Sequence, residues 1–211
     1  MPKITSIKGR VLYNSRGSKT IEIDIISDEK FLGRVCAPSG ASVGKYEAVS
    51  FPDKKPEQSL ELLNKNSEKF LGSDPTDLKL IHDIVKTIDD SENYSKIGGA
   101  CAFAITIAAT ESAAKAINVP LYKIIKQDNN FKFPFPIGNI LGGGAHAGPG
   151  TPDIQEILVV PTGAKTIREA IDMNLTVHKE LRKLIQNDDP TLQMDVVTRV
   201  DGRQYMIMKK H

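Results

Sequence analysis

The chain of 211 residues is long enough for one large domain or two small ones, and its 40% apolar and 26% charged fractions are typical of a globular protein. Its 28 basic and 26 acidic residues give a net charge of +2, which is too balanced to indicate a nucleic-acid or membrane surface. The most apolar stretch, Ala100–Ala109, is far shorter than the roughly 20 residues that span a bilayer. No secretory leader is seen and the two cysteines follow no metal spacing, so a cytoplasmic protein is expected.

The first third of the chain predicts an antiparallel three-stranded meander. Isoleucines at 21, 23 and 25 alternate with acidic residues, which is the pattern of a strand with one buried face. Ile7–Tyr13 and Phe31–Ala37 are its predicted partners. The following segment, Pro38–Gly44, contains two glycines and two serines, and so indicates a loop whose hydroxyl and backbone groups can face a ligand.

Helices are expected after this loop. Polar helices are predicted at about Pro56–Phe70 and Pro75–Ile88. Gly99–Ile117 is apolar almost all round, so it should be the buried central helix of an α+β domain. Two prolines within Phe131–Pro136 enforce extended backbone and indicate a boundary, which divides the chain into domains at 1–133 and 134–211.

The second domain is expected to begin with a strand and a long helix. Ile154–Val160 predicts the strand, and the capping box that starts at Thr166 opens a helix to about Gln186. Apolar residues and one histidine recur along this helix at three- and four-residue steps and are expected on one buried face: Ile167, Ile171, Leu175, His178, Leu181 and Ile185. His178 is therefore assigned to packing rather than to a site.

Few side chains are candidates for chemistry by pattern alone. The glycine run 142–150 carries His146, but it lacks the spacing of a dinucleotide fingerprint, and a solvated turn histidine explains it equally well. Glu156 begins an apolar strand, where it is either a catalytic group or a rim carboxylate held by a lysine. Cys36 and Cys101 are expected to be small hydrophobic residues rather than nucleophiles.

Five separated segments carry a stronger signal. They are Asn14–Gly17, Ala37–Ala48, Asp90–Ala100, Gly142–Gly148 and Gln155–Glu156. In this order and spacing they resemble the enolase family, whose corresponding motifs are D-S-R-G, P-S-G-A-S-T-G-x-x-E-A, G-T-x-N-K-S-x-x-G-A-N, N-G-G-S-H-A-G and Q-E. Departures from the family pattern are Asn14 in place of Asp and a span from His146 to Glu156 that is one residue longer.

The resemblance implies a fold, a reaction and site residues. The fold is an α+β N-terminal domain, a three-stranded meander plus helices, followed by an incomplete enolase-type α/β barrel segment. The reaction is the Mg²⁺-dependent dehydration of 2-phosphoglycerate to phosphoenolpyruvate. Ser39 matches a ligand of the second magnesium ion. His146 and Glu156 match catalytic groups that approach the substrate, and Gln155 matches a substrate-binding neighbour.

Residues 134–211 are too few for a closed barrel domain of about 200 or more residues. The expected Asp-Glu segment, the later metal carboxylates and the lysine base of the family are not found. The chain alone is therefore expected to be inactive. Three explanations remain open: it is a truncated enolase that forms a homo-oligomer, it is one chain of a split enzyme completed by a complementary barrel chain, or it is a non-catalytic interaction module.

The tail 187–211 does not match the family. One hypothesis is a broken or prematurely ended reading frame. The alternative is a genuine hairpin in which Asp201-Gly202 turns between Met194–Val200 and Gln204–Met208 and covers an exposed sheet edge.

Overall fold

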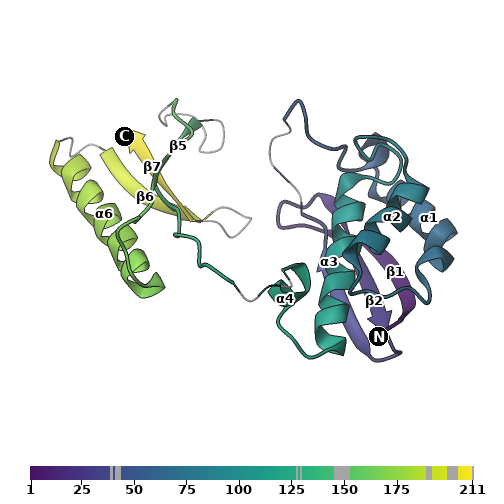
Figure 1. Cartoon of the computed structure of the whole chain (residues 1–211). Helices are drawn as coiled ribbons and strands as arrows, with labels where there is room; N and C mark the ends of the chain where they lie inside the picture. The colour runs from purple at the N-terminus through teal and green to yellow at the C-terminus, as the bar shows by residue number, and fades with distance from the viewer. Residues whose placement is uncertain are drawn as a thin grey trace. The chain divides into compact units, whose positions relative to one another are not determined.

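A computed structural model describes residues 1–38, 40, 44–126, 128, 130–144, 153–188, 192–198 and 204–210, the last two ranges as backbone only. The chain forms two compact units, Met1–Asn129 and Asn130–His211 (Figure 1).

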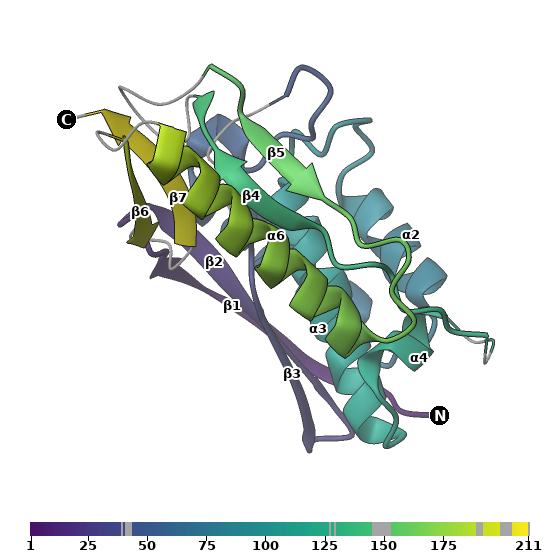
Figure 2. The ribbon, with the colours of Figure 1, turned by 90° about the vertical axis from the view of Figure 1, so that its left-hand side faces the viewer.

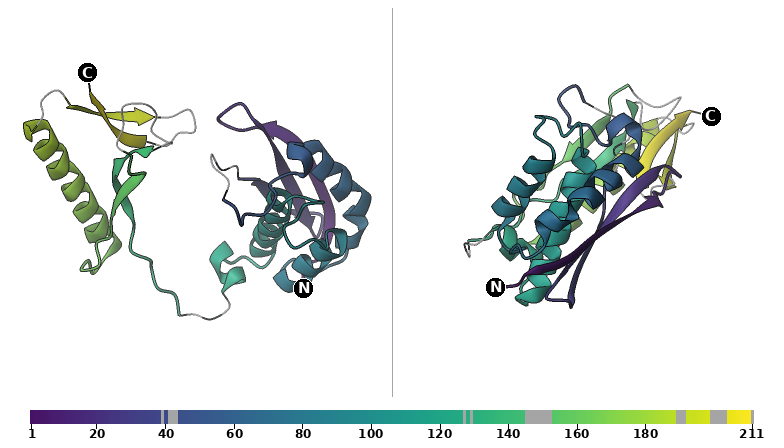
Figure 3. Two further views of the ribbon diagram at one scale, coloured as in Figure 1. Left: turned by 90° about the horizontal axis from the view of Figure 1, so that it is seen from above. Right: turned by 90° about the vertical axis from the view of Figure 1, so that its right-hand side faces the viewer.

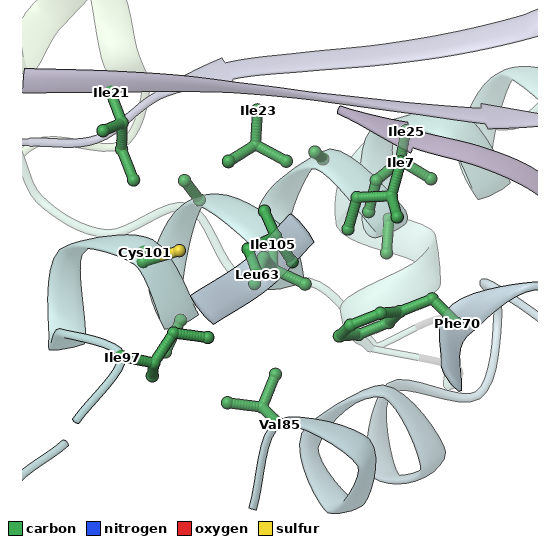
Figure 4. Packing of buried hydrophobic residues seen from close by; sticks show 14 of the residues in the cluster. Ile7, Ile21, Ile23, Ile25, Leu63, Phe70, Val85, Ile97, Cys101 and Ile105 are labelled. Atoms are coloured by element: carbon green, nitrogen blue, oxygen red, sulfur yellow. The ribbon is translucent and has the colours of Figure 1, made fainter. Parts of the chain in front are cut away.

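The first unit is built on an antiparallel sheet of three strands in the order β1-β2-β3, which confirms the predicted meander. The strands are β1 (Ile4–Tyr13), β2 (Lys19–Ser27) and β3 (Phe31–Cys36). The isoleucines at 21, 23 and 25 are fully buried on one face (Figure 4). Strand β1 begins earlier than predicted because Ile4 is itself buried and its N–H donates to the Ser73 carbonyl at 2.9 Å.

Helices cover the buried face of this sheet (Figure 3). They are η1 (Pro52–Lys54), α1 (Pro56–Asn66), η2 (Ser67–Phe70), α2 (Leu78–Ile88), α3 (Gly99–Ala116) and α4 (Leu121–Ile125). The helix predicted over 56–70 is thus divided into an α-helix and a 3-10 turn. Helix α2 begins later than predicted because Asp77 caps it, its carboxylate accepting the Leu80 N–H at 3.0 Å.

Helix α3 is the central helix of the unit, as predicted. Its alanines and Ile105 are almost all buried, and its backbone approaches strand β3 closely at Gly33. The buried hydroxyls of Ser112 and Ser27 are 2.7 Å apart, and Ser112 also donates to the Phe31 carbonyl. Small side chains on both elements therefore determine how closely helix and sheet can pack.

The outer face of the sheet carries charged side chains. Arg34 donates to Asp24 at 2.7 and 2.8 Å, and Arg10 bonds to both Asp24 and Glu22. The hydrogen bonds from Arg34, together with those from Arg10, outweigh partial burial and lower the pKa of Asp24.

The two cysteines differ in environment. Cys36 is exposed at the end of β3, and its Sγ donates to Glu22 at 3.2 Å, so the expectation of a packed hydrophobic residue is wrong there. It fails because Cys36 shares the charged face of the sheet. Cys101 is buried in α3 as predicted, and burial raises the pKa of its thiol to about 12.

The second unit contains a sheet of four strands in the order β5-β4-β7-β6. The elements are β4 (Gly138–Gly142), β5 (Glu156–Val159), α6 (Ile167–Asp188), β6 (Leu192–Thr198) and β7 (Gln204–Lys210). Strand β4 was not predicted, because its glycines obscure the apolar pattern. In the described part the sheet is open, with β5 and β6 at its edges.

The described part of the tail pairs as two strands, which agrees with the hairpin alternative, although the first strand lies two residues earlier than expected. Strands β6 and β7 pair antiparallel from Leu192↔Lys210 to Thr198↔Gln204, and the predicted turn at Asp201-Gly202 lies outside the described residues. Strand β7 pairs with β4 in parallel, with Gly142 opposite Ile207. The hairpin therefore covers the edge of β4 that β5 leaves open.

Helix α6 lies along one face of this sheet, against β4 and β6 (Figure 2). Ala170 is buried, and the Asn174 side chain packs on Gly138 and donates to the Pro136 carbonyl at 3.0 Å. His178 is half-buried, as expected of a packing residue. The packed face is centred on Ala170 and Asn174, so the predicted burial of Ile167, Ile171 and Leu175 is wrong; these side chains are 46–51% exposed.

The second unit should be the less stable of the two. Its buried aliphatic side chains among the described residues are Ile140 and Ala170, whereas the first unit has a large core. We expect amide hydrogens of α6 to exchange at least about a hundredfold faster than those of α3 in the isolated chain. Hydrogen exchange followed peptide by peptide measures this directly. Equal protection of the two helices in a monomer would contradict it.

Candidate functional site

The first candidate region follows strand β3. The predicted metal ligand Ser39 lies outside the described residues, but its surroundings are described in part. The Ala37 carbonyl accepts the buried Thr20 hydroxyl at 3.1 Å, and the Gly40 carbonyl accepts Nη2 of Arg16 at 3.1 Å. A turn formed by Asn14 and Gly17 presents this arginine.

A cavity of about 510 Å³ opens beside this segment. Its lining includes Pro38, Glu47, His82, Phe103 and Thr106. The floor is apolar, because Val85 and the α3 alanines are buried there. The cavity therefore offers an apolar wall with a few polar groups, and among its described lining residues Glu47 is the one carboxylate.

The second candidate region lies where β4 and β5 meet. The Gly143 N–H donates to the Gln155 carbonyl at 2.8 Å, and Gly144 lies against Gln155 with a left-handed φ of 62°. A Cβ on Gly144 would lie 3.2 Å from the Cα of Gln155. The described end of the glycine run is therefore beside Gln155, although His146 itself lies outside the described residues.

Glu156 is the first residue of β5 and is exposed. Nδ2 of Asn139, on the neighbouring strand, donates to its Oε2 at 3.3 Å. Asn139 pairs with Leu158, two residues along β5 from Glu156, so the two polar side chains share one face of the sheet. A bulge between Asn139 and Leu141 interrupts the pairing next to this contact.

The hydrogen-bond donor to Glu156 helps to distinguish a catalytic group from a rim carboxylate. A rim carboxylate was expected to be held by a lysine, but the donor described for Glu156 is the neutral amide of Asn139. A neutral donor orients a carboxylate without neutralising its charge, so Glu156 keeps the ability to interact with a cation or a proton donor. Asn139 had no distinguishing sequence signal, because the contact depends on a strand that was not predicted.

The described part of the chain contains no group of side chains that forms a metal site. Among those residues, no three His, Cys, Asp or Glu side chains are grouped so that they could hold a metal ion. In the same part, no helix has the length and apolar character needed to cross a membrane.

Comparison with known proteins identifies the family. The model of the enolase N-terminal domain matches residues 4–125, and that of the enolase C-terminal TIM barrel domain matches residues 130–197. The second match extends into the tail, so the expectation that the family resemblance ends at residue 186 is wrong for residues 187–197. The first unit, an α+β domain with a three-stranded meander, agrees with the first match, and the second unit is an open four-stranded sheet with one helix, which forms no closed barrel within its described residues. The chain therefore belongs to the enolase family, and the predicted fold class is confirmed.

Three archaeal enolases are among the curated relatives that the chain resembles. The chain is 42% identical over 189 residues to the enolase of Methanothermobacter thermautotrophicus and 41% identical over 189 residues to that of Methanosphaera stadtmanae. It is 36% identical over 183 residues to the enolase of Archaeoglobus fulgidus. These matches cover 87–89% of this chain and 45% of each relative, so the chain spans about half the length of the relatives.

Proposed function

We propose that this chain supplies the N-terminal domain, residues 1–133, and the beginning of the barrel, residues 134–211, of an Mg²⁺-dependent enolase. The reaction is the dehydration of 2-phosphoglycerate to phosphoenolpyruvate in glycolysis and gluconeogenesis, in the cytoplasm. The observation that supports it most is the ordered match to both enolase domains over residues 4–197.

The proposed site residues have separate roles. Glu156 assists departure of the substrate hydroxyl, and Asn139 holds its carboxylate through the 3.3 Å hydrogen bond. Gln155 binds substrate beside it, and His146, which the resemblance alone supports, approaches the substrate from the glycine run.

Ser39 is the proposed magnesium ligand, also on the resemblance alone. Bound magnesium would supply positive charge that stabilises the negative charge developing on the substrate. Mg²⁺ requires near-octahedral oxygen coordination, and the described residues bring no such set together. We therefore propose that the remaining ligands and the lysine base lie in the rest of the barrel, outside these 211 residues, and that the residues of this chain act without a step on the metal.

The isolated chain should not turn over 2-phosphoglycerate. A general base must lie within hydrogen-bond reach of the proton that it removes, and Ser39, His146 and Glu156 do not replace a lysine base. The purified chain is assayed with excess Mg²⁺ by the absorbance of phosphoenolpyruvate. Turnover by the chain alone that disappears in Glu156→Ala would contradict the proposal.

Complementation then tests the split-enzyme form of the proposal. The remaining barrel segment of the Methanothermobacter thermautotrophicus relative is expressed separately and mixed with this chain. We expect turnover to appear, and Glu156→Gln to lower it by about 100-fold or more. Glu61→Gln, which changes an exposed carboxylate on α1, is the matched control and should leave turnover unchanged.

The exposed apolar side chains of α6 favour a partner for the second unit. Ile171 and Leu175 flank the packed face on one side and Met173 and Val177 flank it on the other, all 38–51% exposed. A complementary barrel chain or a second copy would cover them. Stable capture of the barrel segment without turnover would instead favour the non-catalytic interaction module.

The reading-frame hypothesis for the tail has its own test. The nucleotide sequence after the codon for Gln186 is read in all three frames. Reappearance of the Asp-Glu segment, the metal carboxylates and the lysine base in order would support a broken frame. Their absence there, with no barrel chain encoded elsewhere, would support a short protein.

A further inference from the structure

Strand β4 has a neighbouring strand on both of its edges (Figure 2). On one edge β5 pairs with it antiparallel, and Gly142 lies opposite Glu156. On the other edge β7 pairs with it in parallel, and Gly142 lies opposite Ile207. Strand β7 therefore lies beside β4 at the level of the proposed catalytic carboxylate, one strand away from it.

The strand on this second edge lies outside the part of the chain that matches the family. The match to the barrel domain covers residues 130–197, which include β4, β5, α6 and most of β6. Strand β7, at residues 204–210, lies beyond the match. A strand without a counterpart in the family match thus occupies an edge of a strand that belongs to it.

A completed barrel needs this same edge. Each strand of a closed barrel pairs with a neighbour on both sides. Strand β4 has β5 on one side, so its second neighbour in a completed barrel must lie where β7 now lies. One edge offers a single row of backbone N–H and C=O groups, so two strands cannot pair with it at the same time.

The tail strands are held in the second unit at two places. Strand β7 pairs with β4 on one side and with β6 on the other, the latter from Leu192↔Lys210 to Thr198↔Gln204. Helix α6, which lies against β4, also lies against β6. Removing the two strands from β4 therefore requires the loss of backbone pairing and of the contact with α6, and this displacement costs free energy.

We propose that β6 and β7 form an autoinhibitory element, because they occupy the edge of β4 at which the barrel would be completed. The inference rests on the proposed function, in which the rest of the barrel lies outside these residues. The rest of the barrel binds only those chains in which β7 has left β4, so its apparent affinity is reduced by that fraction. In the docked position, β7 also protects an edge that would otherwise be open to pairing with another chain.

Ile207→Pro in the full chain tests whether β7 occupies this edge. Proline has no N–H and is excluded from inner strands, so β7 should not remain paired between β4 and β6. Exchange of the β4 amides that face β7 should rise by about tenfold or more, with unchanged exchange in α3. Gln204→Pro is the matched control, because the first residue of a strand tolerates proline.

Affinity for the rest of the barrel is the second measurement. The remaining barrel segment of the Methanothermobacter thermautotrophicus relative is labelled and titrated with each full chain. We expect Ile207→Pro to bind this segment about tenfold or more tightly than the wild-type chain does. Gln204→Pro should bind it as the wild-type chain does.

The outcomes separate autoinhibition from a merely structural tail. Faster exchange in β4 together with tighter binding by Ile207→Pro supports the proposal. Unchanged exchange in β4 overturns it, and so does equal or weaker binding by Ile207→Pro, including no binding by either chain. If exchange also rises in α6, the titration decides, because an unfolded second unit binds more weakly and a displaced β7 leads to tighter binding.

Turnover of 2-phosphoglycerate in the same mixtures is measured separately. Tighter binding by Ile207→Pro without turnover would overturn the proposed enolase function and leave the autoinhibitory element standing. Turnover with equal affinity of the wild-type chain and Ile207→Pro would do the reverse. The two failures are therefore distinguishable.

Discussion

Replacing Gly33 by alanine should destabilise the first unit by about 3 kcal/mol or more. A Cβ at this position would lie 2.7 Å from the backbone nitrogen of Ser112 and would also overlap the carbonyl of Ala108. Both are backbone atoms of α3, so no side-chain rotation relieves the overlap. The helix must move away from β3, which also weakens the buried hydrogen bond between Ser112 and Ser27.

Urea denaturation followed by amide resonances of α3 measures this effect in the intact chain. Gly163→Ala is the matched control, because a Cβ there meets no atom within 4 Å and its φ is not in the left-handed region. We expect the control to leave the midpoint of α3 unchanged and Gly33→Ala to lower it or to prevent folding. An unchanged urea midpoint in Gly33→Ala would show that α3 does not pack as closely against β3 as the short distances at Gly33 indicate.

Replacing Asp89 by alanine should be comparably disruptive, at about 3 kcal/mol near neutral pH, because four hydrogen-bond donors, one of them buried, lose their acceptor. Asp89 is fully buried at the end of α2. Its carboxylate accepts the backbone N–H groups of Ser91 at 3.0 Å, Lys96 at 2.9 Å and Ile97 at 2.8 Å, and also the Ser91 hydroxyl. This one side chain therefore holds the loop that leads into α3.

The contribution of Asp89 should disappear in acid. Burial opposes ionisation of the carboxyl group, but the hydrogen bonds from Ser91, Ile97 and Lys96 outweigh it and lower the pKa of Asp89 below its ordinary value of 3.8. A group whose pKa is lowered on folding stabilises the native state above its unfolded pKa, and this stabilisation is lost as the pH falls through the folded pKa.

Parallel urea titrations at neutral pH and in acid test both statements. The stability gap between the wild-type chain and Asp89→Ala should narrow below pH 3.8. Asp90→Ala is the control: Asp90 is a neighbouring exposed carboxylate paired with Lys96, and its removal should leave the midpoint unchanged. A gap that is constant across this pH range would contradict the assigned role of Asp89.

Much of the first unit was predictable from the sequence because its signals are local. The alternation of Ile21, Ile23 and Ile25 with polar residues indicates a strand with one buried face, independently of which element packs on that face. Apolar residues on all sides of Gly99–Ala116 indicate a buried central helix. The antiparallel pairing of β6 and β7 agrees with the hairpin alternative for the tail, whose expected turn at Asp201-Gly202 lies outside the described residues. The candidate site residues were found by motif resemblance, and their roles remain proposals.

The sequence by itself thus determined the meander, the central helix and the family to which the chain belongs, and it left the tail open between a broken reading frame and a hairpin. Only the tertiary structure decided which remote segments meet. It decided that Arg16 bonds to Gly40 and Asn139 to Glu156, that α6 packs through Ala170 and Asn174, and that Cys36 lies on a charged surface. The physical reason is that hydrophobic periodicity records which side of an element is apolar, whereas strand pairing and helix rotation depend on steric fit between elements far apart in the chain.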